Sequence, residues 1–322
     1  MTMATAAGLF ADVLGQERAV ALLEASLRSR RLAPAYLLSG PDGVGRRLAA
    51  LRFLEGVIAG PEGSVPLRRR LEAGNHPDLL WVEPTHLDKG QLVPASQALE
   101  RGVSRRSPPQ LRLEQIRELT RFLARRPVEA AGCLVVLDGA EAMAEAAANA
   151  LLKTLEEPGR GMVLLICSAP EQLLSTIRSR CQQIRFGRLD SDSMARVLAA
   201  APAPSCPDPP ELLELAAGSP GALLAHRQQW QGLPEGLVDR LQALPAGTDP
   251  VVALSLARDL TEALDAEQQL WLLQWWQLVL WRHRPSAAAV NRLERLRRQL
   301  LAYVQPRLAW EVALLELAGL VT

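Results

Sequence analysis

Apolar residues over the first 190 positions follow two alternating patterns. Short continuous runs, such as Cys-Leu-Val-Val-Leu at residues 133–137, are typical of strands buried on both faces of a parallel sheet. The segments between them carry apolar residues three or four positions apart, which predicts amphipathic helices. The expected strands are residues 35–39, 79–83, 133–137, 162–168 and 182–186, and the expected helices are residues 17–29, 46–59, 113–124 and 145–157. This alternation predicts an α/β fold with a parallel sheet covered on both faces.

The pattern becomes helical after residue 187, and no further strand is evident. The stretch 202–210 is rich in proline and predicts a loop. Leucine and tryptophan recur at helical spacing beyond residue 232, which predicts an all-helical region. The segment 84–109 combines glycine, proline, serine and charge with little periodicity, so we expect an irregular, mobile surface insertion there.

A glycine-rich loop separates the first expected strand from the helix after it. Gly40, Gly43 and Gly45 have the layout of a phosphate-binding loop, in which backbone N–H groups and a helix N-terminus hold phosphates. The full pattern is Gly-x-x-x-x-Gly-Lys-Ser/Thr, but Arg46 stands at the lysine position and Arg47 at the position of the hydroxyl that binds Mg²⁺. An arginine at the second position would repel the metal. The sequence therefore favours a structural turn without nucleotide chemistry, and weak, vestigial nucleotide binding is the alternative.

Composition and charge narrow the function classes. The chain is 48% hydrophobic and 22% charged, with a net charge of +1, which is ordinary for a globular protein and gives no general affinity for polyanions. Without a groove-reading motif, a stand-alone DNA-binding module is disfavoured. Lys89 and Lys153 are the only lysines, so an arginine in place of a lysine means little on the surface. It means more in a phosphate-binding loop, because a guanidinium does not replace a compact ammonium freely.

The cysteine spacing and the N-terminal sequence provide evidence about metal binding and cellular location. No two of the four cysteines form a Cys-x-x-Cys pair, so we expect no metal site. The N-terminus has no basic segment followed by an apolar run, and we read no signal peptide. The longest apolar run, residues 271–281, is too short to span a bilayer. A cytoplasmic protein without a membrane partner fits best.

Four stretches resemble a known family. They are residues 10–16 (Phe-Ala-Asp-Val-Leu-Gly-Gln), the loop 40–45, residues 148–158 (Ala-Asn-Ala-Leu-Leu-Lys-Thr-Leu-Glu-Glu-Pro) and residues 175–182 (Ser-Thr-Ile-Arg-Ser-Arg-Cys-Gln). Together they resemble the AAA+ subunits of clamp loaders, and within these the delta-prime family of bacterial DNA polymerase III. The last two stretches are specific to clamp-loader subunits rather than to phosphate-loop proteins in general.

The resemblance implies a domain plan and a set of partners. A RecA-like AAA+ module with a degenerate phosphate loop would cover residues 1–187, a helical lid residues 188–231, and a helical collar residues 232–322. The chain would be a non-hydrolysing accessory subunit of the DNA polymerase III holoenzyme, without a cofactor of its own. Its expected partners are the gamma/tau motor subunits, which bind ATP, and the delta subunit. The assembled complex would load the sliding clamp onto primer–template DNA.

The family's catalytic residues match only in part. Asp138 stands where the metal-side acid belongs, but Gly139 follows instead of a glutamate, with Glu141 two positions further on. Gly221 stands where active subunits carry the lid arginine. Ser179, Arg180 and Cys181 match the Ser-Arg-Cys motif, whose arginine reaches the ATP of a neighbouring subunit. Two alternatives stay open: Arg180 pairs with a local carboxylate, or the chain is an ATP-hydrolysing motor subunit of the same machine.

Overall fold

The computed structural model describes residues 8–88, 90–98, 100–103, 108–157, 159–201, 207–244, 249–283, 285–302 and 304–319. The chain divides into two compact units. Unit 1 comprises residues 1–202 with 218–220, and unit 2 comprises residues 203–217 with 221–322. The expected division into three domains, with boundaries after residues 187 and 231, stays a prediction.

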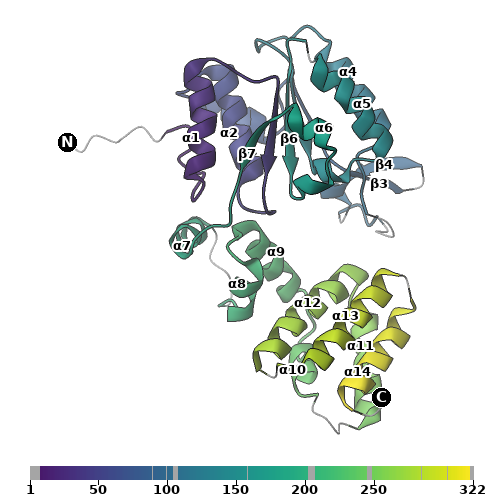
Figure 1. Cartoon of the computed structure of the whole chain (residues 1–322). Coiled ribbons are helices and arrows are strands. Elements are labelled where there is room, and N and C mark those ends of the chain that lie inside the picture. The colour runs from purple at the N-terminus through teal and green to yellow at the C-terminus, as the bar shows by residue number, and fades with distance from the viewer. Residues whose placement is uncertain are drawn as a thin grey trace, which may run out of the picture. The chain divides into compact units, whose positions relative to one another are not determined.

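A parallel sheet forms the centre of unit 1 (Figure 1). Its strands are β1 (Ala35–Ser39), β2 (Leu79–Val82), β5 (Leu134–Asp138), β6 (Met162–Cys167) and β7 (Gln182–Arg185), in the order β2-β5-β6-β1-β7. Every neighbouring pair is parallel. The predicted parallel sheet is confirmed, and each predicted strand agrees with the observed one to within a residue at either end.

Helices cover both faces of this sheet, as Figure 1 shows. Tyr36 and Leu38 of β1 belong to a core shared with one set of helices, and Leu37 belongs to a core shared with the other. Successive strand residues point to opposite faces, which explains why residues 35–38 of β1 are all buried and apolar or aromatic. The first set is α1 (Glu17–Ser29), α2 (Arg46–Ala59) and α3 (Val65–Glu72), and the second is α4 (Leu113–Leu123), α5 (Glu145–Glu156) and α6 (Ser175–Ser179). Helix α7 (Ser191–Ala200) follows the sheet.

The insertion 84–109 is more regular than predicted. Strands β3 (Thr85–Asp88) and β4 (Gln91–Pro94) form an antiparallel hairpin, and a 3₁₀ turn follows at Ala95–Gln97. Val93, Ala98 and Val103 form a small buried cluster of their own. The expectation of an irregular segment is therefore wrong for residues 85–98 as far as they are described, while residues 89, 99 and 104–107 lie outside the described part.

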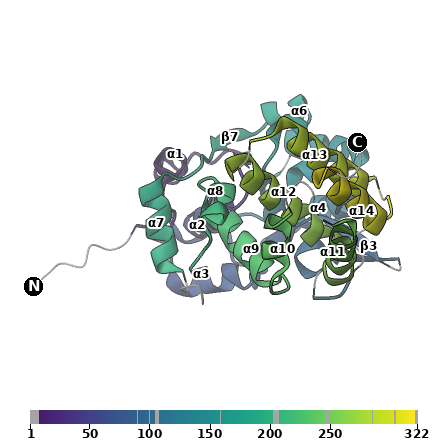
Figure 2. The same cartoon turned by 90° about the horizontal axis from the view of Figure 1, so that it is seen from below.

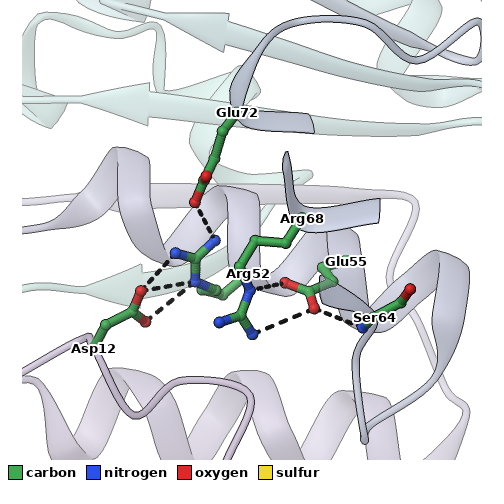
Figure 3. A network of polar contacts seen from close by, with 6 residues as sticks. All are labelled: Asp12, Arg52, Glu55, Ser64, Arg68 and Glu72. Carbon is green, nitrogen blue, oxygen red and sulfur yellow. Dashed lines mark hydrogen bonds and ion pairs between the residues drawn. The ribbon is translucent and has the colours of Figure 1, made fainter. Parts of the chain in front are cut away.

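Two arginine–carboxylate clusters tie α2 to its neighbours in unit 1 (Figure 3). Arg52 binds Asp12, which precedes α1, and its Nη1 lies 2.8 Å from Glu72 Oε1 at the end of α3. One turn further along α2, the Glu55 carboxylate accepts hydrogen bonds from Arg68 and from the backbone N–H of Ser64. Arg52 and Glu55, the buried polar side chains in the middle of α2, are thus both paired.

Unit 2 is helical, as predicted. Its helices are α8 (Pro210–Ala216), α9 (Pro220–Gln231), α10 (Leu237–Gln242), α11 (Pro250–Ala263), α12 (Ala266–His283), α13 (Ala287–Leu301) and α14 (Pro306–Leu317). Helix α13 packs beside α12 and α14, and α14 packs against α11, which both views show (Figures 1 and 2). Trp275, Trp276 and Trp310 are buried among them, and Trp310 Nε1 donates to Gln269 Oε1 at 3.0 Å.

Two further sequence expectations concern the proline-rich stretch and membrane-spanning helices. Residues 202–206 of the proline-rich stretch lie outside the described residues, while residues 207–209 lead into α8 without regular structure. In the part of the chain that the structure describes, no helix is both long enough and apolar enough to cross a membrane.

A buried carboxylate gives unit 1 a testable acid sensitivity. Asp78 is 2% exposed and accepts backbone hydrogen bonds from Val128, Glu129 and Ala130. Burial alone would raise the pKa of Asp78, but these bonds outweigh it and hold the pKa below its ordinary value of 3.8. The charged form therefore stabilises the fold above pH 3.8, and this contribution is lost as the pH falls through the lowered pKa.

Asp78→Asn should lower the free energy of unfolding by about 2 kcal/mol at pH 7, because an amide offers one acceptor oxygen to these donors instead of two. The difference from wild type should shrink as the pH falls below 3.8, because the unfolded chain then binds a proton at Asp78 that the folded chain resists, so the advantage of the charged form declines. Thermal unfolding from pH 7 to pH 3 measures both effects, with the exposed Asp192→Asn as the control. An equal difference at both pH values would contradict this account.

Candidate functional site

The glycine loop keeps a backbone that only glycine can adopt. Gly40 has φ +148°, and a Cβ there would come within 2.3 Å of the Phe186 carbonyl oxygen. Gly45 has φ +99° and stands at the N-cap of α2. Both values lie in the region that favours glycine. The loop therefore has the local geometry that the sequence predicted, with the N-terminus of α2 behind it.

A cavity of about 1020 Å³ opens beside this loop, within unit 1. It is lined by the sequence-predicted residues Gly43, Gly45, Arg46, Arg47 and Asp138. Gly40 supports the loop from outside the lining. The fold thus brings together positions from the loop and from the end of β5, which are about 90 residues apart in sequence.

Arg46, at the lysine position, is paired within the loop. Its side chain is 7% exposed, and its Nη2 forms an ion pair with the Asp42 carboxylate. Its Nη1 is buried and makes no hydrogen bond. The charge at this position is therefore engaged by the loop's own carboxylate rather than presented as an open cation.

Arg47, at the hydroxyl position, reaches across the cavity to the acid at the end of β5. Its Nη1 lies 3.5 Å from Asp138 Oδ2, and its guanidinium lies over the Trp81 ring at 4.6 Å from the centroid. Burial raises the pKa of Asp138 above its ordinary value, although the charges of Arg47 and Arg46 act in the opposite direction. The donor set does not fit Mg²⁺, because one expected ligand is replaced by a cation that pairs with the other.

Glu141 does not fill the place of the missing glutamate. Its Oε1 accepts hydrogen bonds from the backbone N–H of Ser168, at 3.2 Å, and from the Ser168 hydroxyl at the end of β6. Burial would raise the pKa of Glu141, but these hydrogen bonds outweigh it and hold the pKa below its usual value. A charged carboxylate bound in this way holds the loop after β6 and is a poor proton acceptor.

Two residues that sequence reasoning did not single out complete the loop's surroundings. The Gln16 side chain donates to the carbonyls of Val44 and Gly187, and it accepts from the Gly187 N–H. Ser219 Oγ donates to the Asp42 carbonyl at 2.6 Å. Both contacts join distant parts of the chain, so no local pattern could have revealed them; for Gln16, its place in the stretch 10–16 was the only signal.

The Ser-Arg-Cys motif lies at the end of α6, away from the cavity lining. Arg180 Nη2 donates to Glu156 Oε1 at 2.6 Å, and Nη1 donates to the Thr176 carbonyl at 3.1 Å. Ser179 Oγ donates to the same carbonyl. Cys181 is buried in the same core as Ile177, and burial raises the pKa of its thiol to about 12, which makes it unreactive. In this chain alone, Arg180 does pair with a local carboxylate, yet its side chain is 36% exposed.

Comparisons with known proteins identify relatives of this chain. The family profile "DNA polymerase III, delta subunit" matches residues 15–190, and the profile "Cyanobacterial DNA polymerase III delta prime, C-terminal domain" matches residues 192–317. DNA polymerase III subunit delta' of Pseudomonas aeruginosa is 36% identical over 214 residues, which cover 63% of this chain and 58% of that protein. The Bacillus subtilis subunit delta' is 33% identical over 177 residues, covering 53% and 47%. The chain thus spans about half the length of these curated relatives.

Subunits named tau and gamma are similar to this chain as well. The tau/gamma subunit of Haemophilus influenzae is 31% identical over 225 residues, which cover 66% of this chain and 29% of that protein. A solved DNA polymerase III gamma-subunit-related protein from Thermotoga maritima matches with a TM-score of 0.54 at 17% identity, over 92% of this chain and 98% of that chain. This likeness shows the fold, an α/β AAA+ module followed by a helical region. The first profile alone covers more than half of the chain. The chain therefore belongs to the delta-prime family of DNA polymerase III subunits.

Proposed function

We propose that this chain is a non-hydrolysing subunit of a clamp loader and that it supplies Arg180 in trans to the ATP of a neighbouring subunit. The non-hydrolysing role is supported by one observation, the pair between Arg47 Nη1 and Asp138 Oδ2, which lie 3.5 Å apart. The trans role of Arg180 is supported by the complete Ser-Arg-Cys motif and by the exposure of the Arg180 side chain.

The Arg47–Asp138 pair argues against hydrolysis at the chain's own loop. ATP hydrolysis in phosphate-loop proteins needs a metal held by a hydroxyl and an acid, together with a group that positions water. Here the Arg47 guanidinium occupies the position next to Asp138 where a metal would bind. A divalent cation would have to displace the guanidinium, and the two positive charges repel each other. Glu141, the next acid along the chain, is bound to Ser168. These contacts support a loop kept for its structure.

Arg180 is suited to act on a phosphate outside its own chain. A guanidinium is always charged, is planar and can bind two phosphate oxygens at once. Arginines supplied in trans stabilise the charge on a transferring phosphoryl group. The partners we propose are gamma/tau motor subunits, which would bind the ATP, and the delta subunit. The sliding clamp and primer–template DNA would be engaged by the assembled complex.

The competing function is an ATP-hydrolysing motor subunit, which the sequence similarity to tau/gamma subunits supports. An ATPase assay on the purified chain distinguishes this function from the non-hydrolysing role. We expect no Mg²⁺-dependent ATP turnover above background, with a cognate gamma/tau subunit as the positive control in the same assay. Robust turnover that needs Mg²⁺ and disappears in Arg46→Ala would overturn the proposal and favour the motor.

A further inference from the structure

The guanidinium of Arg180 is held by acceptors from two helices. One is the Thr176 carbonyl of helix α6, which Arg180 follows as the C-cap, and the other is the Glu156 carboxylate at the end of α5. An arginine offers five N–H donors in a fixed plane, and these two contacts use only two of them. The side chain is therefore ordered and still has donors free for a further ligand.

Glu156 stands in an electrostatically unfavourable place. It is the last residue of α5, and Glu157 follows it at the C-cap, although the negative end of a helix dipole disfavours carboxylates. Arg180 offsets this cost for Glu156. Among the described residues, Glu157 makes no ion pair. Glu156 and Glu157 are thus adjacent exposed carboxylates at the same helix end, and Glu156 is the one that contacts the candidate trans-acting arginine.

We propose that Glu156 is a positioning residue, whose carboxylate sets the orientation of Arg180 towards the phosphate of a neighbouring subunit; this rests on the proposed function. A free arginine has many rotamers, and ordering one on docking costs free energy. The Glu156 contact orders the guanidinium before a neighbour arrives. The side chain remains 36% exposed, so a phosphate can reach it while the Glu156 contact persists.

The test uses Glu156→Gln with Glu157→Gln as its matched control, since both remove one negative charge at the end of the same helix. Each full-length variant is assembled with cognate motor and delta subunits, and ATP turnover is measured against ATP concentration. We expect Glu156→Gln to lower kcat roughly tenfold with KM for ATP little changed, since the arginine acts in the transition state. Glu157→Gln should match wild type, and thermal unfolding should show both variants folded.

Two further variants separate this inference from the proposed function. If Arg180→Ala abolishes stimulated turnover and Glu156→Gln leaves it unchanged, the positioning role is wrong and the proposed function stands. If Arg180→Ala itself has no effect, the proposed function fails and the inference with it. A faster Glu156→Gln complex would also overturn the inference, because the carboxylate would then restrain Arg180. In an Arg180→Lys background, Glu156→Gln should have little further effect, as expected of residues that act through one another.

Discussion

Replacing Arg180 with alanine is expected to lower ATP turnover at the neighbouring site of the assembled complex by about 10³-fold, in line with trans-acting arginines in other phosphoryl-transfer systems. The reason is electrostatic. The guanidinium would stabilise negative charge that develops on the transferring phosphoryl group, and alanine offers neither charge nor donors. Clamp loading should fall with turnover. Steady-state hydrolysis and a clamp-loading assay on the reconstituted complex measure the two effects.

The Arg180→Ala chain should remain folded, because the contacts that Arg180 loses are near the surface. The ion pair with Glu156 joins two partly exposed side chains, and such pairs contribute little to stability. Arg185→Ala is the matched control, since Arg185 is another exposed arginine of unit 1, at the end of β7. Size-exclusion chromatography shows whether each variant still assembles. Unchanged turnover in an assembled Arg180→Ala complex would refute the trans role.

Replacing Glu55 with alanine should destabilise unit 1 by about 3 kcal/mol, the lower end for breaking a buried ion pair. The Glu55 side chain is fully buried, and it accepts from Arg68 Nε at 2.8 Å and from Ser64 N at 2.7 Å (Figure 3). Removing the carboxylate leaves a guanidinium and a backbone N–H without their acceptor. Urea unfolding followed by circular dichroism measures the loss.

Two comparisons sharpen the test at Glu55. Glu62→Ala removes an exposed carboxylate from the adjacent loop and should change stability by less than about 0.5 kcal/mol. The double variant Glu55→Met with Arg68→Met should recover part of the loss, because replacing both partners leaves no unpaired charge. A double variant less stable than Glu55→Ala would contradict the view that the unpaired partner carries the cost.

The sheet of unit 1 could be predicted from the sequence because its strands are buried on both faces. In β1 and β5, alternate residues face opposite cores, so every position before the last residue of each strand is apolar or aromatic and the strands appear as continuous runs. The glycine loop was equally predictable, since the positive φ values at Gly40 and Gly45 favour glycine. In such cases the local sequence pattern and the tertiary environment favour the same residue types.

The β3–β4 hairpin was missed because its pattern is inverted. Its buried positions include the polar residues Thr85 and His86, whereas Leu87 and Leu92 are exposed. Thr85 forms backbone hydrogen bonds with Gln110, and a contact between residues so far apart in the sequence cannot be predicted from a local pattern. The alternation of apolar residues therefore does not indicate a strand there.

The residues of the candidate site could be predicted from the sequence, but the ion pairs that they form could not. The sequence placed Arg46, Arg47 and Asp138 in one loop-and-strand site, and the cavity brings them together. That Arg47 pairs with Asp138 and Arg180 with Glu156 depends on how side chains cross between elements. Sequence spacing fixes neither contact, because each joins residues on different elements.

The central claim is that this chain serves a neighbour's ATP through Arg180 and not its own loop. One measurement tests it directly: single-turnover ATP hydrolysis by the reconstituted complex carrying either Arg47→Ala or Arg180→Ala. Arg47 is 61% exposed, so its removal should leave the chain folded. The account predicts near-wild-type hydrolysis with Arg47→Ala and a large loss with Arg180→Ala. Loss with Arg47→Ala and full hydrolysis with Arg180→Ala would contradict it.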